Sequence, residues 1–239
     1  MNILAIETSS KNFSVAVSQE GRVVRFRNIV LDKVLESSII PGIDAILKKA
    51  KIKLSEIDGF AVGLGPGSFT SLRVGVATIK AMALSTGKPV VGIPTLDVIA
   101  QNVAQESCDE ICVLTDARRA MVYCGLYEKK NGQISRQSDL MLTTIQDVLK
   151  KVHGQTLYVG SAVAIYRSSI EEAYQKFSKD NPSCRALFST EKHSIAQAAK
   201  LSDLAYARFC KKVYDESGAL VPVYLYAQDC QVQPQAQTK

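Results

Sequence analysis

The sequence predicts an α/β protein of two similar lobes, each a mixed sheet flanked by helices. Two short apolar runs, 57–64 and 90–93, have the length and composition of buried strands. A helical pattern over 69–85 lies between them, and a strand–helix–strand crossover of this kind makes the two strands parallel. The plan of three strands, a helix, a strand and a further helix returns after residue 110. This repetition indicates that one α/β domain has been duplicated.

The first half begins with three strands whose short connections predict an antiparallel meander. We expect strands at 3–7, 13–17, 22–30, 57–64 and 90–93. A helix is expected over 32–51, with Asp32 as its N-cap and Pro41 as a conflict, because proline interrupts a helix interior. The other expected helices, with the residue that ends or caps each, are 69–85 (ended by Gly87) and 96–105 (capped by Thr95).

The second half starts after the polar segment 105–110, where we place a domain boundary. Asn131-Gly132 is a strong signal for a tight hairpin turn. Strands are expected at 111–115, 121–127, 134–142 and 157–160, and helices at 145–152, 164–179 and 194–211. The predicted organisation is an N-terminal lobe, a C-terminal lobe and a disordered tail, at 1–106, 107–228 and 229–239.

The composition is that of a globular protein, with 46% hydrophobic and 22% charged residues. No apolar run approaches the ~20 residues of a membrane span and no signal peptide is visible, so we expect a cytoplasmic protein without membrane contact. The net charge of +6 tolerates a polyanion such as RNA without demonstrating one. Six cysteines without a Cys-x-x-Cys pair, and two histidines without a His-Glu-x-x-His motif, argue against a zinc site and a metallohydrolase.

The segment 63–75, which follows a buried strand and opens a helix, is the most unusual stretch. Gly65 and Gly67 permit backbone angles that other residues resist, and Ser68 and Thr70 can cap the first helical turn. The pattern is neither a Walker P-loop nor a Gly-x-Gly-x-x-Gly motif. Two interpretations are open: a site for a phosphate or carboxylate at the positive helix end, or a tight turn that needs glycine for steric reasons.

The helix over 69–85 is apolar or small on nearly every side, and its only charges are Arg73 and Lys80. One apolar stripe that can cover the sheet is Leu72, Val76, Ile79 and Ala83, and a second, mostly small stripe is Ser71, Gly75, Thr78 and Met82. Such a helix is buried on more than one side. The second cover is either the other domain or another protein chain.

Three segments of the first half form a recognisable set. They are Ile-Leu-Ala-Ile-Glu-Thr-Ser-Ser at 3–10, Gly-Pro-Gly-Ser-Phe-Thr at 65–70 with Leu-Arg-Val-Gly at 72–75, and Pro-Val-Val-Gly-Ile-Pro-Thr-Leu at 89–96. Together they resemble the TsaB (YeaZ) family. The similarity covers nearly all of residues 1–105, and beyond them only short signatures at 116–123 and 222–225. Two departures are Ser71, where the family usually has glycine, and the lack of histidine in 35–41.

The resemblance implies an actin/Hsp70-like ATPase (ribonuclease H-like) fold of two duplicated lobes. It also implies a role in making threonylcarbamoyladenosine beside the tRNA anticodon. In that family TsaB is a non-catalytic partner, TsaD holds the metal and transfers the threonylcarbamoyl group, and the small ATPase TsaE joins the complex. Members pair through two helices of the first lobe, as homodimers or with TsaD. Contact of this chain with tRNA is expected to be indirect or weak. ATP and metal would act in the partner subunits, with no cofactor on this chain.

The resemblance and the small stripe together locate two sets of residues. The expected partner interface, on the helices over 32–51 and 69–85, is Leu35, Ser38, Ile39, Ser71, Val74, Gly75, Thr78 and Met82. The turn of the family motif corresponds to Gly65, Pro66, Gly67, Ser68, Phe69, Thr70 and Arg73.

The loops that an ATPase of this fold needs are incomplete in this chain. The stretches 7–10 and 115–118, expected to be Gly-rich loops, contain no glycine, and Asp116 is expected in a structural salt bridge beside Arg118 and Arg119. We therefore expect a pseudo-enzyme with no catalytic residue and no metal ligand, and no protease. Two alternatives stay open. One is a stand-alone nucleotide- or phosphosugar-binding enzyme that uses 65–70 as an anion cradle, and the other is a homodimer acting in another process.

Overall fold

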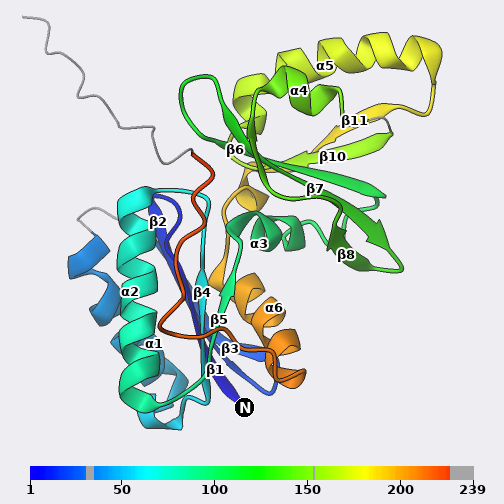
Figure 1. The fold of residues 1–239 in the computed structure, drawn as a ribbon. Coiled ribbons are helices and arrows are strands. Elements are labelled where there is room, and N and C mark those ends of the chain that lie inside the picture. Colours follow the sequence, from blue (N-terminus) through cyan, green and yellow to red (C-terminus); the bar gives the residue numbers. More distant parts are fainter. Residues whose placement is uncertain (31–34, 153, 227–239) are drawn as a thin grey trace, which may run out of the picture.

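Helices and sheets alternate in five layers through the molecule (Figure 1). The computed structural model describes residues 1–30, 35–152 and 154–226. Its helices are α1 (Ile39–Ala50), α2 (Phe69–Thr86), α3 (Thr95–Gln101), α4 (Ile145–Leu149), α5 (Val163–Asp180) and α6 (Ala198–Cys210). The layers are α1 with α2, the first sheet, α3 with α6, the second sheet, and α4 with α5. None of the helices in the described ranges is long and apolar enough to cross a lipid bilayer.

The first sheet has the strand order β3-β2-β1-β4-β5. Its strands are β1 (Asn2–Glu7), β2 (Asn12–Gln19), β3 (Arg22–Val30), β4 (Gly59–Gly63) and β5 (Val90–Ile93). Short turns join β1, β2 and β3, which are antiparallel. β4 runs parallel to β1, and β5 runs parallel to β4 because α2 crosses between these two strands. The meander and the parallel crossover predicted from the sequence are both confirmed.

The second sheet repeats this order as β8-β7-β6-β10-β11, with β9 paired to β7. Its strands are β6 (Glu110–Asp116), β7 (Val122–Lys130), β8 (Gln133–Arg136), β9 (Met141–Thr143), β10 (Gln155–Val159) and β11 (Arg185–Phe188). The matching order confirms the duplication. Asn131 and Gly132 have φ of 51° and 77°, which is the left-handed geometry of the predicted hairpin. The single strand expected over 134–142 is wrong, since it is split into β8 and β9, and β11 was not predicted.

The predicted helix over 32–51 starts too early. A short 3₁₀ turn, η1 (Leu35–Ser37), precedes α1, which begins at Ile39. Pro41 therefore lies in the first turn, where a missing N–H leaves no helical bond unmade, so the expected conflict disappears. The proposed N-cap Asp32 lies outside the described residues, as does the tail 229–239.

Two helices cross between the lobes. α6 comes from the second half of the chain but packs on the first sheet, where Ala198 N donates to Ser14 Oγ at 2.8 Å and the Ser18 and Ser202 hydroxyls lie 2.7 Å apart. α3 follows the first sheet but contacts the second, where the Tyr127 hydroxyl donates to Asp97 Oδ1 at 2.7 Å. Each sheet is therefore covered in part by a helix from the other half of the chain. The domain boundary at residue 106 stays a prediction.

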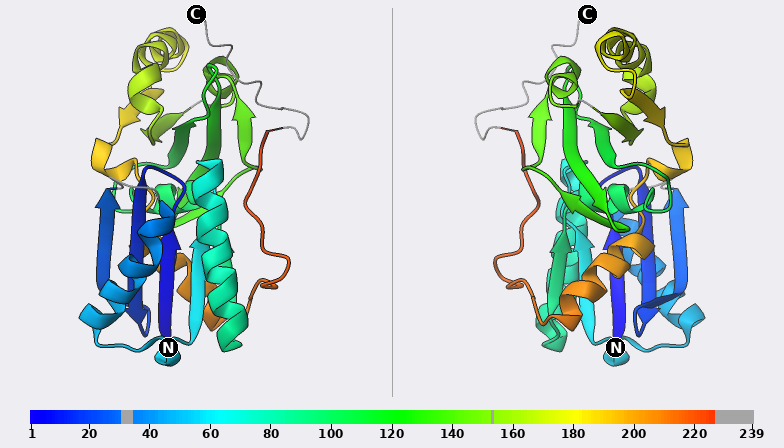
Figure 2. Two further views of the ribbon diagram at one scale, coloured as in Figure 1. Left: turned by 90° about the vertical axis from the view of Figure 1, so that its left-hand side faces the viewer. Right: turned by 90° about the vertical axis from the view of Figure 1, so that its right-hand side faces the viewer.

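The segment 211–226, which we call the strap, runs from the end of α6 along β5 and α2 to the second lobe (Figure 2). Lys80 Nζ donates to the carbonyls of Gly218 and Leu220 at 2.9 and 3.1 Å, and the Leu220 side chain is buried in the core beneath α2. At its end the Tyr226 hydroxyl donates to the Ala117 carbonyl of the second lobe. The strap therefore covers one flank of α2 from within the chain.

Candidate functional site

The glycines of the motif turn are required by close backbone contacts. Gly65 has a φ of +89°, and a Cβ there would lie 2.6 Å from Leu72 Cδ1. A Cβ on Gly67 would lie 2.3 Å from the Ser9 carbonyl oxygen, to which Ser68 N donates at 2.8 Å. The turn therefore packs directly on the loop after β1. Of the two interpretations, the steric one accounts for these glycines.

The expected capping roles in this region are wrong. Ser68 occupies the N-cap position of α2, but its side chain accepts no bond from a backbone N–H of the first turn; its Oγ is hydrogen-bonded to Ser71 Oγ at 3.0 Å. Thr70 lies inside the first turn. Thr95 is the first residue of α3 rather than its cap, and its hydroxyl donates to Glu7. α3 ends at Gln101 rather than at residue 105.

A buried carboxyl joins three segments beneath this turn. Glu7, which is 2% exposed, accepts bonds from Ser9 N at 2.7 Å and from Thr95 Oγ1 at 3.0 Å. Thr95 Oγ1 in turn accepts a bond from Gly65 N at 3.1 Å. Burial raises the pKa of Glu7 above its ordinary value, against the opposing effect of these donors. This network gives the carboxyl at the end of β1 a structural role: it joins the loop after β1, the motif turn and the start of α3.

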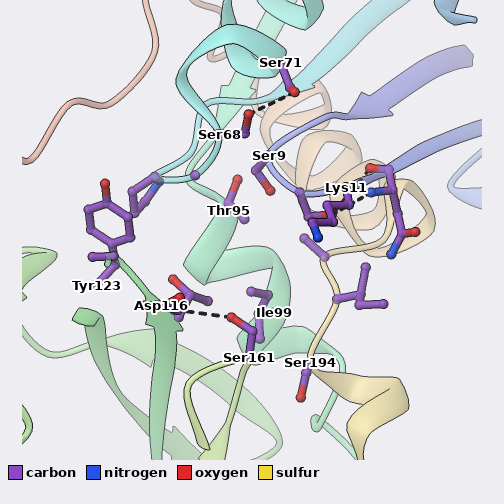
Figure 3. Close-up of a pocket in the computed structure, with 18 of the residues that line it drawn as sticks. Ser9, Lys11, Ser68, Ser71, Thr95, Ile99, Asp116, Tyr123, Ser161 and Ser194 are labelled. Carbon is purple, nitrogen blue, oxygen red and sulfur yellow. Dashed lines mark hydrogen bonds between the residues drawn. The ribbon is translucent and has the colours of Figure 1, made fainter. Parts of the chain in front are cut away.

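Between the lobes lies a cleft of about 780 Å³. Figure 3 shows hydroxyl-bearing side chains from both lobes around it, among them Ser9, Ser68 and Ser161. Asp116 is the only carboxylate among the described lining residues, and Arg118 holds it through its N–H at 2.8 Å and its guanidinium at 3.3 Å. The expected salt bridge of Asp116 is confirmed. No group of three or more His, Cys, Asp and Glu side chains suited to a metal ion occurs in the described part of the chain.

The residues expected at a partner interface are divided by the structure. Leu35, Ile39 and Gly75 are buried within this chain; Leu35 and Ile39 belong to the core beneath α1 and α2. A Cβ on Gly75 would lie 2.3 Å from Thr8 Oγ1, so this glycine contacts the loop after β1 rather than the surface. The partly exposed members of the set are Ser38, Ser71, Val74, Thr78 and Met82.

The exposed residues of α2 include a different stripe, which we call the α2 stripe: Ala77, Ala81 and Leu84. Leu84 is 64% exposed. The apolar pattern located the sheet-facing side correctly, because Leu72, Val76, Ile79 and Ala83 are all buried. It could not show that Thr8 and η1 cover the side of Gly75, or that the strap covers the opposite flank. Ala77, Ala81 and Leu84 lie in the row between the two predicted stripes, and they were left out of the expected interface because the small stripe was taken as the partner face.

An aromatic cluster stands at the start of the α2 stripe. The Arg73 guanidinium lies 3.8 Å above the Phe69 ring, and Arg73 Nε donates to the Tyr224 hydroxyl at 3.2 Å. Phe69 and Tyr224 are each about half exposed. Aromatic and arginine side chains of this kind are enriched in the centres of protein interfaces.

The duplicated sheets, the exchanged helices and the cleft between the lobes define the class, which is the actin/Hsp70-like ATPase fold. A ROK hexokinase from Thermus thermophilus matches with a TM-score of 0.50 at 11% identity over 86% of this chain and 98% of that one. YeaZ from Pseudomonas aeruginosa matches with a TM-score of 0.76 at 23% identity over 94% and 99%. Both likenesses concern the fold.

Sequence comparison identifies the family. A family model described as TsaD, tRNA N6-adenosine threonylcarbamoyltransferase, matches residues 31–231. The tRNA threonylcarbamoyladenosine biosynthesis protein TsaB of Bacillus subtilis is 30% identical over 175 residues, which is 72% of this chain and 76% of that protein. The chain belongs to the TsaB (YeaZ) family, within the group of sequences that the TsaD model describes.

Proposed function

We propose that this chain is a non-catalytic partner subunit in the formation of threonylcarbamoyladenosine on tRNA in the cytoplasm. It binds TsaD, which transfers the threonylcarbamoyl group to adenosine beside the anticodon, and TsaE joins them. ATP and metal act in those partners. The name of the Bacillus subtilis relative and the description of the matching family model support the pathway.

The α2 stripe is the observation that supports pairing of this chain with TsaD. Ala77 and Ala81 are small enough to allow the backbone of a partner helix to approach closely, and Leu84 offers an apolar side chain. The aromatic cluster at Phe69 and Tyr224 extends this surface. A stable complex buries at least ~1,200 Å² in total, so α1 and the strap would contribute at the margins. Without TsaD, the same stripe pairs two copies of this chain.

Two carboxylates, one in the cleft and one buried beneath the motif turn, support a role without catalysis. Asp116, which lines the cleft, is paired with Arg118. Glu7, at the end of β1, is buried in a network with Ser9 and Thr95 that holds the loop in place. Both carboxylates are engaged by groups of this chain, which favours a structural role for each.

The test is reconstitution with TsaD and TsaE of the same organism, following threonylcarbamoyladenosine on tRNA. We expect modification to require this chain, and the chain alone to hydrolyse no ATP. Ala81→Glu places an unpaired charge on the α2 stripe and should weaken TsaD binding at least about tenfold, because burying such a charge is costly. The matched control is Ala164→Glu, at an exposed alanine on α5.

Modification that proceeds unchanged without this chain would contradict the proposal. Magnesium-dependent ATP turnover by the purified chain would favour the alternative, a nucleotide- or phosphosugar-binding enzyme that uses the cleft. Dimerisation through the α2 stripe without any affinity for TsaD would indicate a homodimer acting elsewhere. Gly75→Glu is unsuitable as an interface probe, since its side chain would collide with Thr8 inside the chain.

A further inference from the structure

The outer edge of the first sheet carries a row of arginines. β3 is the edge strand, and Arg22, Arg25 and Arg27 are all exposed on it. Arg25 Nε donates to the carbonyl of Lys49 at 3.1 Å, which brings the strand against the lysine-rich end of α1. Lys51, the C-cap of α1, is exposed beside Lys49. We call Arg22, Arg25, Arg27, Lys49 and Lys51 the basic edge.

The charges of the basic edge are not neutralised within the described parts of the chain, where none of its five residues forms an ion pair. The nearby carboxylates are used elsewhere. Asp44 pairs with Lys48 at 2.7 Å, Glu20 pairs with the N-terminal amine, and Glu56 accepts the backbone N–H of Lys53 at 2.7 Å. The positive field therefore extends into solvent.

Two common structural roles explain part of the positive charge of the basic edge. Lysines at a helix C-terminus favour the negative end of the helix dipole, and charged side chains on an edge strand hinder pairing with another strand. Neither role requires three arginines within six residues, and the strand pairing sets Arg22, Arg25 and Arg27 opposite Gln19, Val17 and Val15, so that all three lie on the same face of the sheet as α1. A second copy of this chain is a poor partner for the edge, because strand pairing would set like charges against each other.

The chemistry fits the phosphate backbone of RNA. The guanidinium group binds phosphate through two parallel hydrogen bonds, and the row from Arg22 to Arg27 extends about 17 Å at ~3.3 Å per residue. In Figure 2, α1 lies between β3 and α2, so the basic edge is a surface separate from the α2 stripe.

We infer that the basic edge binds the sugar–phosphate backbone of the tRNA that the complex modifies. The inference rests on the proposed function for the identity of the RNA. The contact itself belongs to this chain, so it can be measured without TsaD.

The test is binding of an unmodified tRNA transcript to the purified full-length chain at several salt concentrations. The variant is Arg22→Gln/Arg27→Gln/Lys49→Gln. The matched control, Lys176→Gln/Lys179→Gln/Arg185→Gln, removes the same charge from exposed positions on α5 and the edge strand β11. Loss of three phosphate contacts should weaken binding at low salt at least about tenfold, and should reduce the slope of log K against log salt by about 2–3. The control should bind as the unaltered chain does.

An equal loss in the variant and the control would overturn the inference, because binding would then follow net charge alone. Displacement of the tRNA by polyglutamate of equal total charge would also overturn it, since the edge would then accept any acidic polymer. Binding of TsaD by the same variants is measured in parallel. If the chain binds tRNA through the basic edge but does not bind TsaD, the proposed function fails and the RNA contact stands.

Discussion

The contact between Gly75 and Thr8 allows a prediction in which two effects of known sign compete. On an exposed helix, Gly→Ala stabilises by about 1 kcal/mol through helix propensity. Here the new Cβ would lie 2.3 Å from Thr8 Oγ1 and 3.0 Å from Thr8 Cγ2, and overpacking of this kind costs about 1–3 kcal/mol. We expect Gly75→Ala to lower the free energy of unfolding by about 1 kcal/mol net. For a chain of this size that lowers Tm by about 2–4 °C.

The same contact predicts a rescue. Thr8 Oγ1 is buried without a hydrogen-bond partner in the described residues, so Thr8→Ala removes both an unsatisfied group and the colliding atoms. In the Thr8→Ala background we expect Gly75→Ala to be neutral or stabilising, a coupling of about 1–2 kcal/mol in a double-mutant cycle. Thermal and urea unfolding of the four proteins measure it, with Ala77→Gly on the exposed side as a control. A higher Tm for Gly75→Ala in the unaltered background would refute the reasoning.

Three further predictions concern the network, the strap and the hairpin. Burial raises the pKa of Glu7 above its ordinary 4.5. The contribution of protonated Glu7 to the free energy of unfolding is therefore complete below pH 4.5 and is lost as the pH rises through the raised pKa. Between about pH 4.5 and 8 the Tm of Glu7→Gln should fall less than that of the unaltered chain. Lys80→Met removes two charge-assisted bonds to the strap and should cost about 1.5–3 kcal/mol, with faster proteolysis within 211–226; unchanged cleavage would count against the strap contacts. Asn131→Val forces a β-branched residue to a φ of 51° and should cost about 1–2 kcal/mol in urea unfolding, whereas Asn131→Gly should cost less.

The sequence pattern was sufficient to predict those parts of the fold that depend on residues close together in the sequence. The apolar runs of the first lobe became strands with nearly the predicted bounds, and the turn at Asn131-Gly132 formed because left-handed angles are cheap there. The sheet-facing stripe of α2 followed from its helical period alone. The duplication was visible because the second half repeats the order of elements.

Contacts between distant segments were not predictable in the same way. The burial of Gly75 depends on Thr8, the covered flank of α2 depends on Leu220 of the strap, and α6 packs on strands that precede it by far. Periodicity reports that a face is apolar, but it carries no information about which segment will cover it. The start of α1 was misplaced because an apolar pattern continues through η1, although the chain turns there.

The exchange of α6 has a consequence for how this protein is made. Ala198 and Ser202 meet Ser14 and Ser18 across 184 residues of sequence, so the first sheet gains its inner cover only when most of the chain has left the ribosome. Until then, the side of that sheet that includes Ile3 and Ala61 has no α6 to bury it. Such non-local completion slows folding and exposes apolar surface during synthesis. A fragment that stops at residue 106 lacks α6 and would leave this apolar face of the first sheet exposed. The two lobes are therefore best expressed as one polypeptide.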